Sequence, residues 1–262
     1  MAMVRRIRKT KGLAPLPEDW VLAQPGTDLS YLAVQGELRP AYGVEHYVRS
    51  IVRALSRTDK ASCALVGLTG TGKSAIVEQL AIEQAAGRLP EPIASHRIVR
   101  VSLQEIAGLQ PPGQDTNDYW SYFSRLVHET RIGSVILFWD EFQAIFFWPV
   151  SCQTLKPYLA RGELRVIAAT TPAEFDRFVR YDPALERRFQ VIPVAEPDAE
   201  QLRRILEGVA SSLSARYQVA IERNVIEECI RLSRYLPQNQ PDAAIDLLEI
   251  AAMEASESVA AN

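Results

Sequence analysis

Cysteine and histidine are scarce in this sequence, with three of each among 262 residues. Cys63, Cys152 and Cys229 lie far apart and form no C-x-x-C pair, and no histidine has metal-ligand spacing to a cysteine or an acid. These absences argue against a disulfide framework and against a zinc site. We interpret the three cysteines as reduced thiols of a cytoplasmic protein.

Long apolar runs are missing too. No stretch approaches the roughly 18 residues that a membrane-spanning helix needs. No apolar segment of the secretory type follows the basic N-terminus. We therefore expect neither a membrane segment nor a secretory signal.

Net charge gives little guidance about partners, because the total is only −3. Residues 1–11 are the exception, since they contain no acid and five cations: Arg5, Arg6, Arg8, Lys9 and Lys11. Two interpretations of this segment stay open. It is either a solvated tail or an arm that contacts nucleic-acid phosphates.

The abundant residues predict a folded α/β chain. The sequence is 47% hydrophobic and 23% charged, which is ordinary for a globular protein. Short apolar runs alternate with stretches of helical periodicity. The expected strands are 62–66, 98–102, 134–139, 164–169 and 189–194, and the expected helices are 29–35, 44–55, 75–87, 119–130 and 154–159. Strands that alternate with helices predict a parallel sheet flanked by helices.

The pattern changes after residue 196. Three helices are expected at 198–214, 222–235 and 241–258, with no strand between them. Residues 1–27 are basic and then punctuated by proline and glycine, which predicts a flexible arm. Thr27 or Asp28 is expected to cap helix 29–35, and Gly36 to end it. We divide the chain into an N-terminal arm (1–27), an α/β domain (28–196) and a small helical domain (197–262).

Residues 67–74 read GLTGTGKS and fit the phosphate-binding loop G-x-x-x-x-G-K-[ST] between a predicted strand and a predicted helix. Glycine permits the positive φ angles with which successive backbone N–H groups turn toward one anion. A phosphate there would lie at a helix N-terminus. Lys73 is expected to neutralise the β- and γ-phosphates, and Ser74 to hold Mg²⁺. The expected nucleotide-binding residues of the loop are Gly67, Thr69, Gly70, Thr71, Gly72, Lys73 and Ser74.

A second acidic element follows the apolar run at 134–139. Asp140 and Glu141 stand directly after it, in the Walker B arrangement. The first acid would bind Mg²⁺ through its water shell, and the second would polarise the attacking water. A surface position at the end of a strand is the simpler alternative for Glu141. Together with residues 67–74, this pair predicts binding and hydrolysis of ATP or GTP with Mg²⁺.

Two further segments fit phosphoryl transfer. Thr170 and Thr171 end a predicted strand, where a hydroxyl can reach the γ-phosphate or orient the water, although a plain strand end before a Pro172 turn is the alternative. Arg187 and Arg188 precede the last predicted strand. They could offer a guanidinium to the nucleotide of a neighbouring subunit, although such a pair is by itself usually solvated surface.

A longer set of motifs carries a family resemblance. Residues 155–164 read LKPYLARGEL, residues 169–171 read ATT and residues 184–190 read ALERRFQ. In this order they resemble the AAA+ ATPases, and specifically the first ATPase module of the Clp-family unfoldases and disaggregases. Segments 28–43, 194–197 and 241–247 extend the resemblance over most of residues 28–252.

The resemblance implies roles for particular residues. Thr170 would be sensor 1, Arg187 and Arg188 would act in trans as arginine fingers, and Tyr42 and Gly43 would line the adenine pocket. The helical region after residue 197 would be a lid domain. The nucleotide would be ATP, and the assembly would be a ring, commonly a hexamer, because each site borrows an arginine from its neighbour.

Departures from the family pattern concern contact with a substrate. The aromatic pore-loop motif of the family is absent from 108–118, and Ala243 replaces a lysine of the lid. The aromatics at 119–123 fit a helical core stripe better than a pore loop. Phe146, Phe147 and Trp148 replace a polar loop, either as an exposed gripping or docking patch or as packing. No coiled-coil middle segment and no second phosphate loop are present, so we expect a stand-alone module rather than a complete disaggregase.

Three functions fit these observations. The first is an ATP-hydrolysing, ring-forming motor that remodels a protein partner. The second is a DNA-linked AAA+ regulator of transposition, conjugation or replication loading, which would use the cations from Arg5 to Lys11 on nucleic acid. The third is a nucleotide-controlled scaffold with slow turnover. The first is our prediction, because the best match is to protein remodellers and the Walker set is complete.

Overall fold

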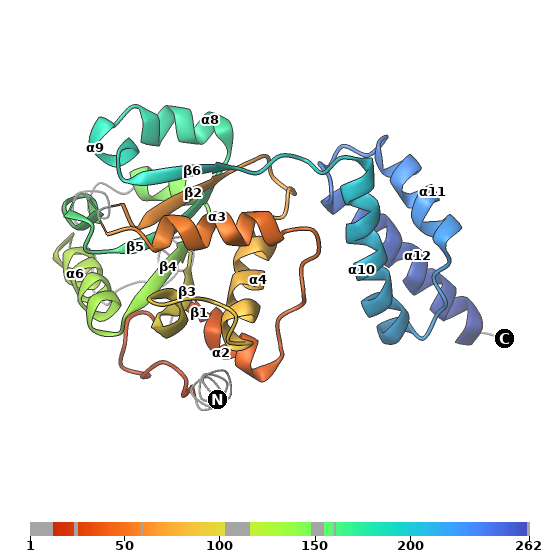
Figure 1. Cartoon of the computed structure of the whole chain (residues 1–262), viewed down its shortest axis with the longest axis horizontal. Coiled ribbons are helices and arrows are strands. Elements are labelled where there is room, and N and C mark those ends of the chain that lie inside the picture. Colours follow the sequence, from red (N-terminus) through yellow and green to blue (C-terminus); the bar gives the residue numbers. More distant parts are fainter. Residues whose placement is uncertain are drawn as a thin grey trace.

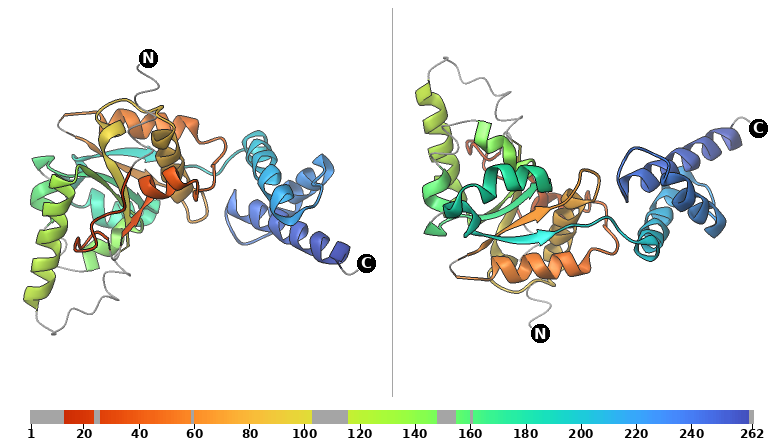
Figure 2. Two further views of the ribbon diagram at one scale, coloured as in Figure 1. Left: turned by 90° about the horizontal axis from the view of Figure 1, so that it is seen from below. Right: turned by 90° about the horizontal axis from the view of Figure 1, so that it is seen from above.

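The computed structural model describes residues 13–23, 26–58, 60–102, 116–147, 155–159 and 161–260. It has an α/β body and a separate cluster of helices that carries the C-terminus (Figures 1 and 2). The basic segment 1–11, residues 108–115 and Trp148 lie outside the described residues. Within the described ranges, no helix combines the length and the apolar character that crossing a bilayer requires.

Within these ranges the body is built on a six-stranded sheet in the order β1-β3-β4-β5-β2-β6. Its strands are β1 (Gly26–Asp28), β2 (Ser62–Val66), β3 (Arg97–Val101), β4 (Val135–Trp139), β5 (Arg165–Thr170) and β6 (Phe189–Pro193). β1 pairs with β3 in the antiparallel direction, and the other pairs are parallel. β4, β5 and β2 are neighbours, so the residues that follow these strands meet at one edge of the sheet.

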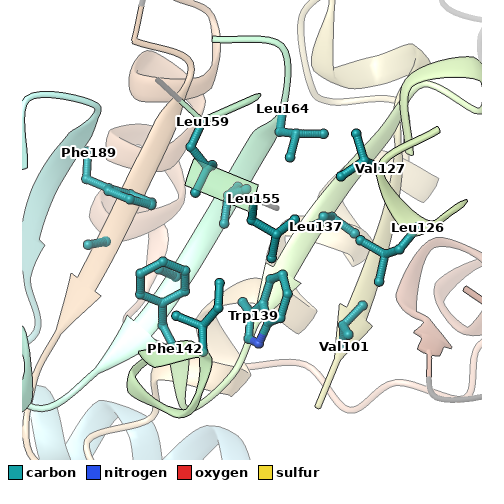
Figure 3. Packing of buried hydrophobic residues seen from close by; sticks show 14 of the residues in the cluster. Val101, Leu126, Val127, Leu137, Trp139, Phe142, Leu155, Leu159, Leu164 and Phe189 are labelled. Carbon is teal, nitrogen blue, oxygen red and sulfur yellow. The ribbon is translucent and has the colours of Figure 1, made fainter. Parts of the chain in front are cut away.

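Helices cover both faces of the sheet, which explains the continuous apolar runs of its central strands. α2 (Leu29–Gln35), α3 (Glu45–Leu55) and α4 (Lys73–Ala85) pack on one face, where β4 buries Ile136 and Phe138. α6 (Thr116–Ile132) and η3 (Phe175–Arg180) cover the other face, where β4 buries Leu137 and Trp139 (Figure 3). The predicted parallel sheet flanked by helices is confirmed.

The caps of α2 follow from local sequence signals. Asp28 accepts a hydrogen bond from the backbone N–H of Tyr31 at 3.0 Å and so caps the first turn. Gly36 ends the helix with a φ of 77°, a left-handed conformation that glycine adopts without strain. Both ends agree with the predicted helix 29–35.

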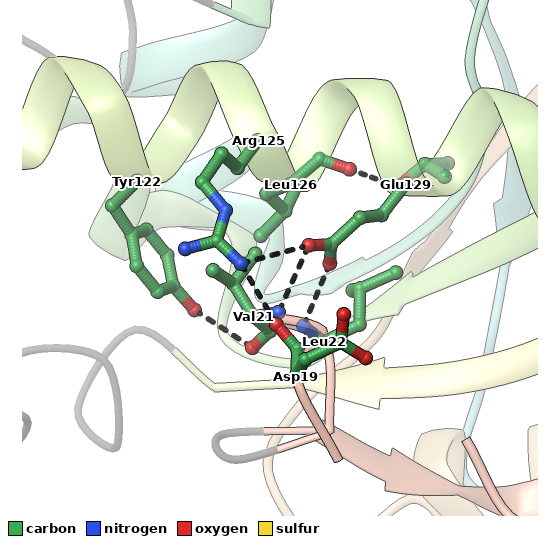
Figure 4. A network of polar contacts seen from close by, with 8 residues as sticks. Asp19, Val21, Leu22, Tyr122, Arg125, Leu126 and Glu129 are labelled. Carbon is green, nitrogen blue, oxygen red and sulfur yellow. Dashed lines mark hydrogen bonds and ion pairs between the residues drawn. The ribbon is translucent and has the colours of Figure 1, made fainter. Parts of the chain in front are cut away.

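The second half of the expected N-terminal arm is packed onto the body instead. Leu22 is fully buried, and the buried carboxylate of Glu129 in α6 accepts the backbone N–H groups of Val21 at 3.0 Å and Leu22 at 3.1 Å (Figure 4). The next described residues, Gly26–Asp28, form β1. The prediction of a flexible arm is therefore wrong for residues 13–23 and 26–27. The partners of Val21 and Leu22 lie 108 and 107 residues further along the chain, and those of β1 lie in β3, so no local signal predicts these contacts.

The helices after β6 form a cluster of their own. α10 (Ala199–Tyr217), α11 (Arg223–Ser233) and α12 (Asp242–Ala260) share an apolar core that includes Leu206, Ile230 and Leu248. They correspond to the three helices predicted after residue 197, and their ends differ by at most a few residues. The remaining short elements are η1 (Ile93–Ser95), η2 (Phe142–Phe147), α8 (Pro172–Glu174) and α9 (Pro183–Glu186).

Candidate nucleotide-binding site

A cavity of about 640 Å³ lies at the carboxyl ends of β2, β4 and β5, with α10 and the start of α12 on its other side. It gathers residues from the body and from the helical cluster. Most of the predicted site residues line it: Tyr42, Gly43, Thr69, Gly70, Thr71, Gly72, Lys73, Ser74, Asp140, Glu141, Thr170 and Thr171. Gly67 begins the phosphate loop, and Arg187 and Arg188 are not among the lining residues.

Residues 67–74 adopt a turn that depends on their glycines. Gly70 and Gly72 have φ angles of 81° and 85°, which other residues rarely adopt. At Gly67 a Cβ would lie 2.3 Å from the carbonyl oxygen of Val194, so the close approach of two backbones also requires glycine. Gly72 is the N-cap of α4 and provides no side chain to the first N–H groups of the helix. Those groups and the helix dipole favour an anion at this position.

Lys73 brings a positive charge to this loop. Its ammonium group donates to the carbonyl oxygens of Gly67 at 2.8 Å and Leu68 at 2.7 Å. Burial lowers the pKa of Lys73, while the nearby carboxylates of Asp140 and Glu174 act in the opposite direction. The lysine is therefore held at the loop by backbone carbonyls, and two acids are near enough to attract its charge.

Ser74 and Asp140 bring two oxygen ligands together. The Ser74 hydroxyl donates to the Asp140 carboxylate at 2.7 Å, so the first turn of α4 meets the residue that follows β4. Hydroxyl and carboxylate oxygens are the donors that a hard cation such as Mg²⁺ prefers. The chemistry of this pair fits the magnesium site that the sequence predicts.

Glu141 has a strained backbone. Its φ of 52° is left-handed, which costs a residue other than glycine on the order of 1 kcal/mol. The residue is exposed and lines the cavity beside Asp140. Strain at an acid that lines a cavity favours a functional role for Glu141 over a purely surface one.

Thr170 is buried at the end of β5 and turns its hydroxyl toward the cavity wall. The hydroxyl oxygen lies 3.1 Å from Gln143 Oε1 and 3.4 Å from Glu174 Oε2, and its carbonyl accepts the N–H of Gly67 at 3.1 Å. Gln143 and Glu174 also line the cavity, and sequence reasoning missed both. A signal for Glu174 existed, because Thr171 and Glu174 form a T-x-x-E capping box at the start of α8.

Tyr42 and Gly43 lie where the body meets α10. The Tyr42 ring packs so closely on Gly208 that a Cβ there would lie 2.3 Å from Tyr42 Cγ. Gly43 faces Ile205 of the same helix, and Ile245 of α12 extends this apolar wall of the cavity. An apolar wall with an aromatic ring suits a flat heterocyclic base.

The helical cluster also touches the phosphate loop directly. Asn239 donates from Nδ2 to the carbonyl of Thr69 at 2.9 Å, and the N–H of Asp242 donates to the carbonyl of Gly70 at 3.3 Å. The orientation of the cluster is thus coupled to the conformation of the loop.

Comparison with known proteins covers both parts of the chain. The model of the AAA lid domain matches residues 198–261. The chaperone protein ClpB of Tropheryma whipplei (strain TW08/27) is 37% identical over 236 residues, which cover 87% of this chain and 33% of that protein. The chaperone protein ClpB of Yersinia enterocolitica is 36% identical over 240 residues, 88% of this chain and 27% of that protein.

Solved structures agree with these matches. The S. cerevisiae Hsp104:casein complex in its extended conformation has a TM-score of 0.82 and 32% identity, covering 91% of this chain and 42% of that chain. The chain is a Clp-type AAA+ module. It spans about a third or less of the length of the ClpB relatives. The predicted fold, a P-loop sheet followed by a helical lid, is confirmed.

In this AAA+ module Arg187 and Arg188 lie away from the cavity of their own chain. They follow α9 and precede β6, which runs parallel to β2. The phosphate loop follows the carboxyl end of β2, whereas the arginines precede the amino end of β6. The arginines and the loop therefore lie at opposite ends of these two strands, ~15 Å apart along the strand direction. Arg187 is exposed there. A role for the pair in the site of a neighbouring subunit stays a prediction.

The AAA+ module packs several aromatics that the sequence left open. Phe123 of α6 is fully buried and Tyr122 packs against the same core, as the interpretation of a core stripe predicted. Phe146 stacks on Phe178 with ring centroids 5.4 Å apart, so packing is the correct alternative for Phe146. Ala243 is buried within the lid. Among the aromatics that the sequence left open, the side chains of Tyr119, Trp120, Phe147 and Trp148 lie outside the described residues.

Proposed function

We propose that this chain binds ATP with Mg²⁺ in the cavity and hydrolyses it, as a subunit of a ring, commonly a hexamer, that remodels a protein partner. One observation carries the proposal: Lys73, Ser74, Asp140, Glu141 and Thr170 surround a single cavity at the carboxyl ends of adjacent strands. Phosphoryl transfer needs cationic, hydroxyl and acidic groups in such an arrangement, since its catalysis is mostly positioning and charge stabilisation.

Each of these residues has a part that its position supports. Bound Mg²⁺ would offset negative charge on the phosphates, with Ser74 and Asp140 as the residues that hold it. Lys73 would exchange its contacts with loop carbonyls for contacts with phosphate oxygens. Glu141 would orient the attacking water, and Thr170 would contact the terminal phosphate or that water.

Adenine fits the apolar part of the same cavity. Tyr42 and Gly43 line this part together with Ile205 and Ile245. The base would then lie between body and lid, while the phosphates reach the loop at residues 67–74. This placement makes ATP binding sensitive to the orientation of the lid.

The relatives support a protein as the partner. The ClpB proteins are chaperones by name, and one Hsp104 structure is a complex with casein. Because the chain spans a third or less of the ClpB relatives, remodelling by this chain is a proposal. These relatives give no support to the DNA-linked alternative, and the segment from Arg5 to Lys11 lies outside the described residues.

Single-site variants test the proposed hydrolysis. Lys73→Ala should abolish ATP binding, because it removes the cation of the phosphate loop. Glu141→Gln should keep ATP bound and lower turnover by roughly 100-fold or more, because the carboxylate that orients water is lost. Lys60→Ala and Glu254→Gln alter exposed residues outside the cavity and serve as controls. Equal turnover by wild type and Glu141→Gln would remove the role of Glu141, and tight binding by Lys73→Ala would refute the site.

The partner is tested by ATPase rate in the presence of unfolded casein or of DNA, at a stated salt concentration. A rate that rises with casein and not with DNA supports a protein remodeller. A rise with DNA that disappears when residues 1–11 are removed would favour the DNA-linked alternative instead.

A further inference from the structure

Glu174 has more contacts than a helix cap requires. Its Oε2 accepts the backbone N–H of Thr171 at 3.2 Å, which belongs to the capping box of α8, and also the Thr171 hydroxyl at 2.7 Å. The same oxygen lies 3.4 Å from the Thr170 hydroxyl. The residue also lines the cavity and interacts electrostatically with Lys73. One carboxylate thus lies beside the Thr170 hydroxyl and is near enough to Lys73 to attract its charge.

The cap itself does not need a negative charge at this position. α10 begins with the same motif made by an amide, in which Asp198 is the N-cap and its N–H donates to Gln201 Oε1 at 3.0 Å. Glutamate and glutamine are equivalent at this position of a capping box. The charge of Glu174 therefore has an effect separate from the cap, and that effect falls on the cavity.

A negative charge here opposes a phosphate. Asp140 hydrogen-bonds the Ser74 hydroxyl and is proposed to hold Mg²⁺, which would offset its charge. Glu174 instead lies 3.4 Å from the Thr170 hydroxyl, a donor that a phosphate oxygen would use. A phosphate that approaches Thr170 must compete with Glu174 for that hydroxyl. Like charges also repel strongly where water is partly excluded. A diphosphate that ends before Thr170 meets less of this repulsion.

We infer that Glu174 is a specificity-determining residue of the nucleotide site, whose carboxylate lowers the affinity for a nucleoside triphosphate relative to the diphosphate. The inference rests on the proposed function, since it assigns the last phosphate to Lys73 and Thr170. Because the charge weakens the binding of ATP relative to that of ADP, ADP competes better for the site. The fraction of sites that hold ATP then depends on the ADP level.

Equilibrium binding of ADP and of the non-hydrolysable analogue β,γ-imido-ATP to the full chain, both with Mg²⁺, tests this inference. Glu174→Gln keeps the cap and removes the charge, so the affinity for the analogue relative to ADP should rise on the order of fivefold. Asp182→Asn is the matched control, because Asp182 caps α9 through the N–H groups of Ala184 and Leu185 and does not line the cavity. Its affinity ratio should equal that of wild type.

Glu174→Asp and Glu174→Asn form a second pair, equal in length and different in charge. The affinity for the analogue relative to ADP should be higher in Glu174→Asn than in Glu174→Asp, by the same factor. This pair tests the inference even if Glu174→Gln does not fold. An unchanged or lowered ratio in variants that bind ADP normally would overturn the role of Glu174 and leave the nucleotide site in place. No binding of either nucleotide by wild type would overturn the proposed function itself.

Discussion

Tyr42 and Gly208 come into contact where the body meets the lid, and the contact leaves no room for a side chain on Gly208. Gly208→Ala should destabilise the chain by about 1–3 kcal/mol, because the added Cβ forces the Tyr42 ring to move. In an ordinary helix interior the same change stabilises by about 0.5–1 kcal/mol, so the sign of the effect is diagnostic. Denaturant unfolding measures it.

The Tyr42→Ala background provides the control for this prediction. Once the ring is absent, Gly208→Ala should be neutral or stabilising, because the two positions are coupled only through the contact. A loss of the same size in both backgrounds would show that the ring is not the cause.

The residues that we propose for the phosphate chemistry belong to sequence motifs, whereas their neighbour Gln143 does not. Lys73, Ser74 and Asp140 belong to motifs in which spacing along the chain encodes the geometry. Glu174 lies four residues from Thr170 and belongs to a local capping box, whereas Gln143 approaches Thr170 only because η2 packs at the same edge of the sheet. Contacts of that kind depend on tertiary packing, which one sequence does not reveal.

Among the elements, α6 holds residues 13–23 against the body through Glu129. Glu129→Ala should lower the free energy of unfolding by about 2–4 kcal/mol, because it leaves the N–H groups of Val21 and Leu22 without their acceptor. Glu129→Gln keeps one acceptor oxygen and should lose less. Denaturant unfolding gives the size of the loss, and limited proteolysis near Trp20 reports release of the segment. An unchanged unfolding free energy in Glu129→Ala would show that the hydrogen bonds from Val21 and Leu22 to Glu129 do not stabilise the chain.

His96 links η1 to β5 and makes the stability of the body depend on pH. Its Nδ1 lies 2.7 Å from the Pro92 carbonyl oxygen, and the Arg165 guanidinium lies 3.1 Å from its Nε2, so the neutral ring donates to one and accepts from the other. Burial lowers the pKa of His96 from its ordinary value of 6.5. As the pH falls, His96 is protonated in the unfolded chain before it is protonated in the folded chain. The free energy of unfolding therefore decreases as the pH falls below about 6.5.

A substitution tests this pH dependence. His96→Gln should flatten the fall in unfolding free energy between about pH 7 and pH 5, since the titrating ring is removed. His128→Gln alters an exposed histidine of α6 and should leave the slope unchanged. Identical slopes for wild type and His96→Gln would rule out His96 as the source.

The sequence predicts the features of an element that depend on neighbouring residues, but not its pairing with distant segments. The ends of α2 were predictable because Asp28 and Gly36 act on their own helix. The pairing of β1 with β3 was not, since Thr27 and its partner Arg100 are brought together by the sheet as a whole. Pairing over such separations is decided by burial and register rather than by propensity.

At the scale of the whole molecule, a ring would join the cavity of one chain to the arginines of the next. Arg187 and Arg188 lie toward the end of the sheet opposite their own cavity, and we predict that they act at the nucleotide of a neighbouring chain. Arg187→Ala or Arg188→Ala should lower ATPase turnover on the order of 1,000-fold without weakening ATP binding. Arg223→Ala, at an exposed position of the lid, is the control.

Mixing of subunits separates this account from a defect within one chain. Lys73→Ala chains lack a working site but keep both arginines, so adding them to an arginine variant should restore part of the activity. Full turnover by the arginine variants, or by wild type that sedimentation shows to be monomeric, would contradict the shared site.

The most direct test of the central claim is a structure of Glu141→Gln determined with ATP and Mg²⁺. The account predicts a triphosphate in the cavity, with Lys73 Nζ moved from the carbonyl oxygens of Gly67 and Leu68 onto phosphate oxygens. A cavity without nucleotide at saturating ATP, or a nucleotide bound elsewhere while Lys73 keeps both carbonyl contacts, would contradict it.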